Sequence, residues 1–273
     1  MERPWRRRER IVSLAPSVTS ILVALGSRKA LVGVSRWCPA VAPVADLPQL
    51  GDCWQIDPAA VRELSPTLIV GSVPYRAEVL AQLLELPCTF VATNPRSLDD
   101  IFREIRLLGR LTGRVHRANR LILRMQNFFR MVAERTRQLP RLRVYAEAWP
   151  NPRIASPPWV AELIALAGGE MIVPPGQKVD DFEVARRDPE VIVLAWTATG
   201  ERSRRESALE NVHWKDTTAV RTDRVFVVPD ELLNTPGPPL MDGLRLLVRL
   251  VHPEVVLPAK RWPRERRARA KCA

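Results

Sequence analysis

The sequence contains few of the residues from which enzymes and metal sites are usually built. It has three histidines and four cysteines among 273 residues, and no pair of cysteines has the CxxC spacing. A structural zinc site is therefore not expected. The GxSxG, HExxH, Walker A and GxGxxG patterns are also absent, so no motif indicates a hydrolase, a metalloprotease or a nucleotide-dependent enzyme. We expect a protein that is not an enzyme.

Long apolar runs are missing as well. No stretch reaches the ~18 apolar residues that a membrane-spanning helix requires. The basic start of the chain leads into folded-looking sequence at Arg10 without the apolar segment of an export signal. As written, the chain is therefore expected to be cytoplasmic, with its cysteines as free thiols.

Acidic residues are too few to balance the basic ones, and the excess of positive charge lies mainly at the two ends of the chain. The net charge is +12; residues 1–10 contribute +3 and residues 259–273 contribute +6, which leaves +3 for the body between them. Such a basic tail can touch anionic lipid or nucleic acid without specificity. The alternative is a disordered, solvated segment that keeps the protein soluble.

What the sequence does contain is a regular alternation of short apolar runs with helical patterns. Residues 67–71, TLIVG, form an unbroken apolar run typical of a strand buried in a parallel sheet. A strand is expected at residues 142–146, followed by a long loop at residues 147–158. Short connections between alternating strands and helices predict right-handed βαβ units in both halves of the chain.

One long helical stretch, residues 97–139, separates the two halves. Ser97 is suited to cap its start, with Asp99 and Asp100 in the first turn, and Gly113 indicates a break. The expected fold class is α/β, with two Rossmann-like lobes of mainly parallel sheet, a long rigid connecting helix and a ligand cleft between the lobes. The expected division is a basic extension at 1–9, a lobe at 10–96, the helical connection at 97–139, a second lobe at 140–257 and a basic tail at 258–273.

Ligands of open α/β sheets gather beyond the carboxyl ends of the strands. Aromatic residues make up only 6% of the chain, yet four of the eight tryptophans fall in loops at such ends. Either they fill the interface between the halves, or they line a cleft for a large flat ligand that a few polar groups orient. The candidate residues are Ser17, Trp37, Cys38, Trp54, Ser72, Tyr75, Trp149, Trp196 and Asn234.

Several segments, in order along about residues 10 to 255, resemble the vitamin B12/iron-chelate periplasmic binding proteins. The tryptophan-containing segments are most similar to the cobalamin-binding branch of that family. The matching segments are 10–19 (RIVSLAPSVT), 32–39 (VGVSRWCP) and 50–54 (LGDCW) in the first lobe, and 163–169 (LIALAGG), 188–194 (DPEVIVL) and 235–243 (TPGPPLMDG) in the second.

The resemblance implies two α/β lobes bridged by a rigid helix. It also implies capture of a corrinoid or metal chelate between the lobes, as bound ligand rather than catalytic cofactor, for delivery to an ABC permease. Members of the family are periplasmic, and we expect a monomer. The resemblance assigns ring stacking to Trp54 and cleft positions to the segments that contain Trp37, Trp149, Trp196 and Gly237.

The chain departs from the family pattern at three positions. Ser20, Ala59 and Pro239 stand where a glutamate, an acidic permease-docking residue and an arginine are usual, which weakens the importer role more than corrinoid binding. The alternatives are a cytoplasmic corrinoid chaperone or sensor, a binder of haem or a siderophore, and an α/β hydrolase or transferase. Cys38 or Cys53 either fills space or places a thiolate on the cobalt of a bound corrinoid.

Overall fold

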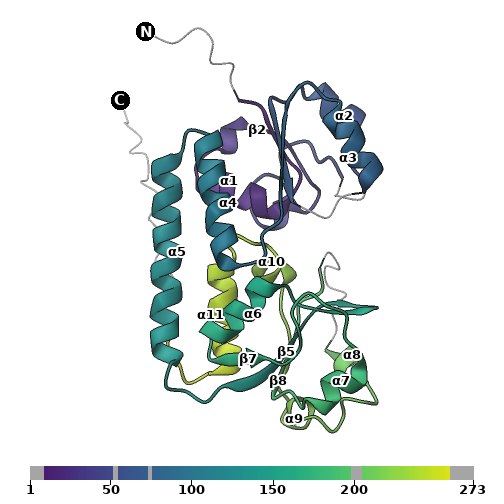
Figure 1. Ribbon diagram of the computed structural model, residues 1–273, viewed down its shortest axis with the longest axis vertical. Helices are drawn as coiled ribbons and strands as arrows, with labels where there is room; N and C mark the ends of the chain where they lie inside the picture. Colours follow the sequence, from purple (N-terminus) through teal and green to yellow (C-terminus); the bar gives the residue numbers. More distant parts are fainter. Residues whose placement is uncertain (1–8, 52–54, 73–75, 198–204, 259–273) are drawn as a thin grey trace, which may run out of the picture.

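The structure, a computed structural model, describes residues 9–51, 55–72, 76–197 and 205–258. Figure 1 shows two lobes, one above the other, with helix α5 (Val115–Thr136) running along both of them. Helix α4 (Leu98–Leu111) lies beside α5 next to the first lobe. The two-lobed α/β arrangement expected from the sequence is therefore confirmed.

The first lobe holds a four-stranded sheet in the order β2-β1-β3-β4, and all of its strand pairs are parallel. Residues Leu68, Ile69 and Val70 are buried in the central strand β3, as their apolar run predicted. The strands are β1 (Ile11–Ser13), β2 (Leu31–Val34), β3 (Leu68–Ser72) and β4 (Thr89–Thr93), and the helices are α1 (Pro16–Ala24), α2 (Pro58–Glu63) and α3 (Ala77–Leu84).

The second lobe holds a sheet in the order β6-β5-β8-β9, with β7 also paired to β5. The β5–β6 pair is antiparallel and the other pairs are parallel. Its strands are β5 (Leu142–Pro150), β6 (Arg153–Ala155), β7 (Gly169–Met171), β8 (Val191–Leu194) and β9 (Val225–Val227). Its helices are α6 (Pro158–Leu166), α7 (Asp181–Arg186), α8 (Glu206–Leu209), α9 (Thr218–Arg221), α10 (Asp230–Leu233) and α11 (Leu240–Val251).

The prediction of a long loop at residues 147–158 is wrong. Strand β5 continues to Pro150, and the chain turns back at once into β6, so that Trp149 pairs with Ile154 across the hairpin. The hairpin supplies backbone hydrogen-bond partners to residues that a loop would leave to water. It therefore carries Trp149 on an ordered strand rather than on a loop.

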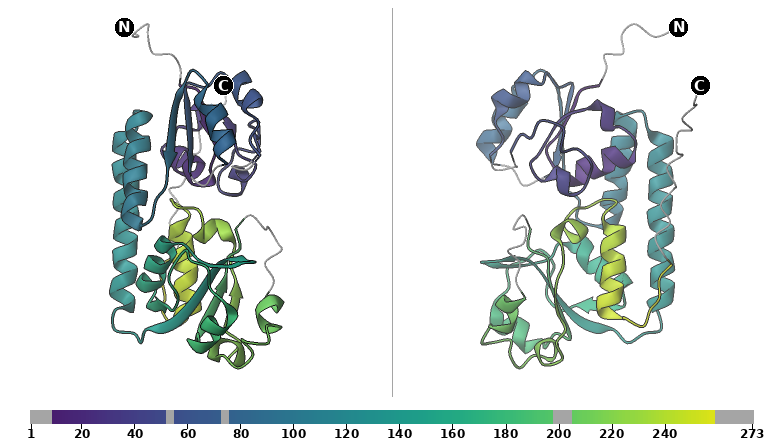
Figure 2. Two further views of the ribbon diagram at one scale, coloured as in Figure 1. Left: turned by 45° about the vertical axis from the view of Figure 1, so that its right-hand side comes forward. Right: turned by 180° about the vertical axis from the view of Figure 1, so that it is seen from behind.

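The connection between the lobes is a pair of helices. Ser97 caps α4, its side chain accepting a hydrogen bond of 3.1 Å from the backbone N–H of Asp100, as the sequence predicted. Gly113, with φ of +66°, makes the turn after α4, where the chain reverses so that α4 and α5 pack side by side (Figures 1 and 2). The pair approaches closely at Gly109, where an added Cβ would lie 2.5 Å from the Cβ of Ala118.

One apolar cluster runs through both lobes. It joins Ile21 of the first lobe to Met125 and Val132 of α5, and continues to Val144 and Leu244 of the second lobe. Burial of this single cluster is the main stabilising contribution that the two lobes share. Among the described residues, no helix is both long and apolar enough to cross a membrane.

Candidate functional site

The carboxyl ends of the strands in both lobes point toward the space between the lobes (Figures 1 and 2). Trp37 follows β2 in the first lobe and Trp149 lies near the end of β5 in the second. These two indoles are 38% and 39% exposed, a large fraction for so apolar a side chain. The Nε1–H of Trp149 donates a 3.0 Å hydrogen bond to the backbone oxygen of Asn151, which restrains its ring.

Trp196 and Asn234 lie together at the end of β8. The side-chain amide of Asn234 donates hydrogen bonds to the backbone oxygen of Ala195 at 2.6 Å and to Oγ1 of Thr197 at 3.0 Å. Asn234 thus ties the segment after α10 to the end of β8. Its Oδ1 is buried and has no hydrogen-bond partner among the described residues. Trp196 is only 8% exposed, so it offers a ligand much less surface than Trp149 does.

A buried charged network lies under the second-lobe tryptophans. The carboxylate of Glu147, which is fully buried, accepts hydrogen bonds from Tyr145 Oη at 2.6 Å, Trp196 Nε1 at 2.8 Å and Arg153 Nη1 at 2.9 Å. Burial raises the pKa of Glu147, and Arg153 and the donated hydrogen bonds oppose that rise. Burial and the nearby Glu147 carboxylate raise the pKa of the Tyr145 hydroxyl. The network fixes the plane of the Trp196 indole.

Arg153 extends this network toward α7. Its guanidinium also pairs with Asp181, and it stacks over the ring of the buried Trp214 at 4.3 Å from the ring centroid. The sequence pattern did not indicate Glu147 or Arg153 as residues of the site. The Asn-Pro pair at residues 151 and 152 is a turn signal that would have indicated the hairpin, and pairing across it brings both charged side chains to one face.

The other described candidates of the first lobe, Ser17, Ser72 and Cys38, are less exposed than Trp37. Ser17 is only 3% exposed at the start of α1, whereas Ser72, at the end of β3, is half-buried. The side chain of Cys38 is fully buried, and its Sγ lies 3.0 Å from Thr19 Oγ1 and 3.1 Å from Ser35 Oγ.

The environment of Cys38 argues against a thiolate ligand. Burial raises the pKa of the Cys38 thiol, although hydrogen bonds from Ser35 and Thr19 partly oppose the rise. A neutral thiol that contacts no solvent cannot meet a metal in the cleft without rearrangement. The structure therefore gives Cys38 the space-filling role, and we do not propose it as a cobalt ligand. Cys53, Trp54 and Tyr75 lie outside the described residues, so their predicted roles stay predictions.

Gly237 lies where the two lobes touch. It is buried, and a Cβ added to it would lie 3.1 Å from Oγ of Ser20 and 3.3 Å from Cγ1 of Ile21, both on α1 of the first lobe. The absence of a side chain at Gly237 lets the second lobe approach α1. The structure thus gives this candidate residue a place in the contact between the lobes.

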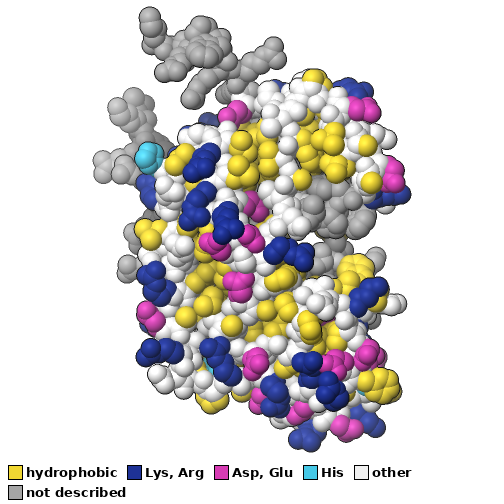
Figure 3. Space-filling model, viewed as in Figure 1, with side chains coloured by type: hydrophobic (Ala, Val, Ile, Leu, Met, Phe, Trp, Pro, Cys, Tyr) yellow, Lys and Arg dark blue, Asp and Glu magenta, His cyan; other side chains and the backbone are white. Residues whose placement is uncertain are grey.

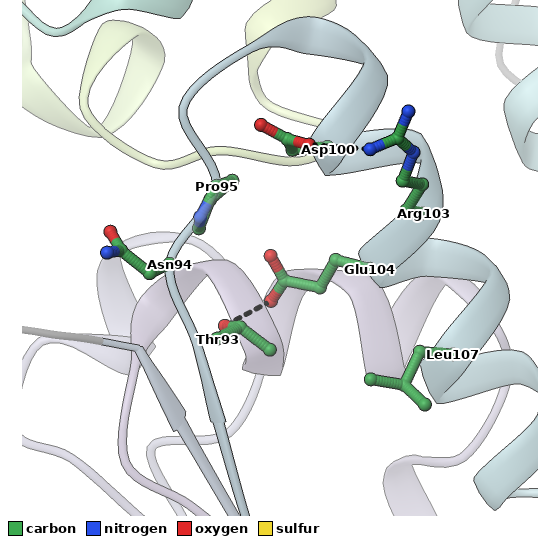
Figure 4. A pocket seen from close by; sticks show the side chains of 7 residues that line it. All are labelled: Thr93, Asn94, Pro95, Asp100, Arg103, Glu104 and Leu107. Carbon is green, nitrogen blue, oxygen red and sulfur yellow. Dashed lines mark hydrogen bonds and ion pairs between the residues drawn. The ribbon is translucent and has the colours of Figure 1, made fainter.

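A separate cavity of about 360 Å³ lies where β4 leads into α4 (Figure 4). Glu104 lines it and is only 5% exposed. Its Oε1 accepts a 3.0 Å hydrogen bond from Thr93 Oγ1, while its Oε2 has no hydrogen-bond partner among the described residues. Burial raises the pKa of Glu104 to about 7. The cavity lining consists of Thr93, Asn94, Pro95, Asp100, Arg103, Glu104 and Leu107.

The described part of the chain holds no group of three or more His, Cys, Asp or Glu residues that could bind a metal ion. Each lobe instead carries one exposed indole near the carboxyl end of a strand, Trp37 after β2 and Trp149 in β5. Such surfaces bind flat apolar molecules by stacking.

Comparisons with known proteins agree with this geometry. The profile of a family described as periplasmic binding protein matches residues 11–232. A vitamin B12-binding protein of Vibrio cholerae is 25% identical over 251 residues, which cover 86% of each chain. An ABC transporter substrate-binding lipoprotein of Bacillus subtilis is 23% identical over 259 residues, covering 90% of this chain and 81% of the relative.

The fold also matches solved structures. A periplasmic heme-binding protein from Pseudomonas aeruginosa aligns with a TM-score of 0.81 and 24% sequence identity, covering 91% of this chain and 94% of the other. At this level of identity the likeness concerns the fold. It confirms the two-lobed architecture described above.

Proposed function

We propose that this protein, which belongs to the periplasmic binding protein family, captures a corrinoid or a related flat metal chelate between its lobes. Members of this family bind solutes and are not catalysts, so the chain is a binding protein and not an enzyme. The bound chelate is its cargo. No catalytic cofactor takes part.

The observation that carries this proposal is the pair of exposed tryptophans, Trp37 and Trp149. Each lobe contributes one indole at the carboxyl ends of its strands, and each is more than a third exposed. Stacking on an aromatic ring contributes roughly 1–3 kcal/mol for each base in nucleic-acid complexes. Two rings on opposite lobes would therefore support tight binding of a macrocycle without any covalent or metal bond to the protein.

A corrinoid is our first choice of ligand because the Vibrio cholerae relative is a vitamin B12-binding protein that matches over most of both chains. Haem is the second choice, because the fold matches a heme-binding protein closely. Haem iron needs an axial ligand from the protein. None of the three histidines, all of which are described, lies at the strand ends: His116 is on α5, His213 packs against Phe182 and His252 is buried. A haem ligand would therefore have to come from a residue such as Tyr75.

We further propose that the protein hands its cargo to an ABC importer, in line with the transporter role in the name of the Bacillus subtilis relative. The lobes would be residues 10–96 and 140–257, joined by the helices of residues 97–139. A corrinoid chaperone or sensor is the alternative. If adding the loaded protein stimulates transport through an ABC permease, that result would favour the importer over the chaperone.

Titration of the purified protein with cyanocobalamin, cobinamide, haemin and ferric siderophores tests the proposal. Tryptophan fluorescence and heat are the two readouts. We expect saturable quenching by a corrinoid with one ligand per chain. Saturable binding of haemin alone, lost in Tyr75→Phe, would make haem the ligand. If none of the four compounds binds, the proposal is overturned.

Variants then locate the site. Trp37→Ala, Trp54→Ala and Trp149→Ala should each weaken binding roughly ten- to a hundredfold, the scale of a lost stacking ring. Trp37→Phe and Trp149→Phe are matched controls that keep a flat ring and should retain most of the affinity. An alanine variant with unchanged affinity would remove that residue from the site.

A further inference from the structure

The positive charge of the folded body is concentrated on the helical connection. Residues 103–137 contain ten arginines and two glutamates, a net charge of +8. Because the whole chain carries +12, residues 1–10 carry +3 and residues 259–273 carry +6, the rest of the body must carry −5. The segment from Arg103 to Arg137 is therefore basic, while the rest of the body taken together is acidic on balance.

This charge lies on the outer sides of α4 and α5. The apolar residues of both helices, such as Ile105 and Met125, are buried against the lobes. Figure 3 shows Lys and Arg side chains over α4 and along α5. We call this surface the basic face; its exposed arginines are Arg103, Arg106, Arg110, Arg120, Arg124 and Arg130.

Most of these arginines are not neutralised within the protein. Arg103 pairs with Asp99 at 2.7 Å and with Asp100 at 3.3 Å. The other five arginines of the basic face form no ion pair with any residue that the structure describes. On α5 the only acidic residue is Glu134, in the last turn of the helix. The basic face is therefore free to attract an anionic partner.

Apolar side chains are exposed among the arginines. Leu107 on α4 is 39% exposed and Leu123 on α5 is 57% exposed. Leu107 lies between Arg103 and Arg110 on the outer side of α4, and Leu123 adjoins Arg124. Exposed leucines among basic residues are typical of helices that lie in a membrane interface, where the leucines enter the acyl boundary and the arginines bind headgroups.

The end of the described chain lies beside α5 and α11. Arg135 of α5 donates a hydrogen bond to the backbone oxygen of Val256, and Arg245 donates one of 2.7 Å to that of Pro258. The residues that follow, 259–273, carry a net charge of +6. The described chain therefore ends next to α5, the longer of the two helices that carry the basic face.

We propose that the basic face docks the protein on an anionic phospholipid bilayer. The exposed leucines favour lipid over nucleic acid, because a phosphate backbone in water offers them no apolar environment. The β5–β6 hairpin, which contains Trp149, projects from the second lobe on the side away from α5 (Figures 1 and 2). Docking through the basic face would therefore leave the ligand-binding side accessible. The proposal does not depend on which ligand the protein binds.

Binding of the full chain to lipid vesicles tests the proposal. Sedimentation with vesicles of equal parts phosphatidylglycerol and phosphatidylcholine should pellet the protein at physiological salt, and vesicles of phosphatidylcholine alone should not. The triple variant Arg110→Gln/Arg120→Gln/Arg124→Gln should weaken binding roughly 100-fold, since each arginine near an anionic surface contributes about a factor of five. Circular dichroism would confirm that the variant is folded.

The matched control is Arg62→Gln/Lys215→Gln/Arg221→Gln, which removes the same charge from exposed positions on the two lobes. It should retain most of the binding. Equal loss in both triple variants would overturn the proposal, because binding would then follow net charge alone.

Leu107→Ser/Leu123→Ser should weaken vesicle binding several-fold and leave binding to a DNA duplex unchanged. Preferential binding to DNA, insensitive to the leucine change, would make nucleic acid the partner and sink the membrane proposal.

Discussion

Glu104 is an acidic side chain placed where water hardly reaches. It is 5% exposed, and its Oε1 has one neutral donor, the hydroxyl of Thr93. The charged groups near it are Asp100 and Arg103 on the same helix, which line the same cavity (Figure 4). Burial raises its pKa to about 7 from the ordinary value of 4.5, so the folded protein holds this proton more tightly than the unfolded chain does.

The stability contributed by that proton is fully present below the unfolded pKa and is lost as the pH rises through the folded pKa. We predict that the free energy of unfolding falls by about 3 kcal/mol from this group as the pH rises through this interval. Glu104→Gln cannot titrate and should lack this component. Urea unfolding of both proteins at several pH values measures it, and parallel pH profiles would contradict the prediction.

Glu147 is also buried, but its carboxylate accepts several hydrogen bonds. Arg153, Tyr145 and Trp196 all donate to its carboxylate. Removing one partner of a buried ion pair leaves the other charge uncompensated, which typically costs about 3–5 kcal/mol. We predict a loss of this size in Glu147→Ala and a smaller loss in Glu147→Gln, which keeps an acceptor. Urea unfolding followed by tryptophan fluorescence would measure both.

Glu210 offers a control for this prediction, since it is exposed on the same lobe. Glu210→Ala should change the free energy of unfolding by no more than about 0.5 kcal/mol, as surface substitutions usually do. A loss in Glu147→Ala no larger than in this control would mean that the network does not stabilise the lobe.

At the scale of elements, the spacing of α4 and α5 depends on Gly109. A methyl group there would lie 2.5 Å from the Cβ of Ala118, which has no flexible side chain to move aside. Alanine gains about 1 kcal/mol of helix propensity over glycine, and overpacking costs about 1–3 kcal/mol. We therefore predict that Gly109→Ala lowers the free energy of unfolding on balance, as chemical denaturation would show.

The double variant Gly109→Ala/Ala118→Gly moves the methyl group from one helix to the other. A double-mutant cycle should give a favourable coupling of about 1 kcal/mol or more, because the second change relieves the clash. Additive effects of the two substitutions would show that the helices are not in contact at this point.

The sequence predicted those features that depend on residues close together in the chain. The cap at Ser97 and the apolar run of β3 are set by neighbouring residues, and both were predicted. Strand β7 depends on pairing with the distant strand β5, and the hairpin at Trp149 depends on the turn at residues 151 and 152, so periodicity within each segment revealed neither. The burial of Cys38 depends on Thr19 and Ser35 folding around it, which no local pattern shows.

At the scale of the whole molecule, the lobes are held in place by several contacts. The cluster that contains Met125 of α5 is continuous through both lobes. Glu162 of α6 accepts a 3.1 Å hydrogen bond from the backbone N–H of Leu98 at the start of α4, and Gly237 fits closely against Ser20. Helix α5 contains neither glycine nor proline that would serve as a hinge.

We therefore predict little closure of the lobes when a ligand binds. Small-angle scattering of the free and loaded protein should give nearly the same radius of gyration. A contraction of several ångströms on adding ligand would contradict the prediction. Gly237→Leu, which would push the lobes apart at their contact, provides a positive control for the sensitivity of the measurement.

The continuous cluster also bears on how the protein emerges from the ribosome. Val132, near the end of α5, belongs to a cluster whose remaining members include Leu244 and Val251 of α11, the last helix of the described chain. Translation at about 5–20 residues per second would need roughly 6–25 s to cover the stretch between α5 and the end of α11. During that time the apolar side of α5 has only part of its covering, so the nascent chain is a natural client for a chaperone that holds exposed helices.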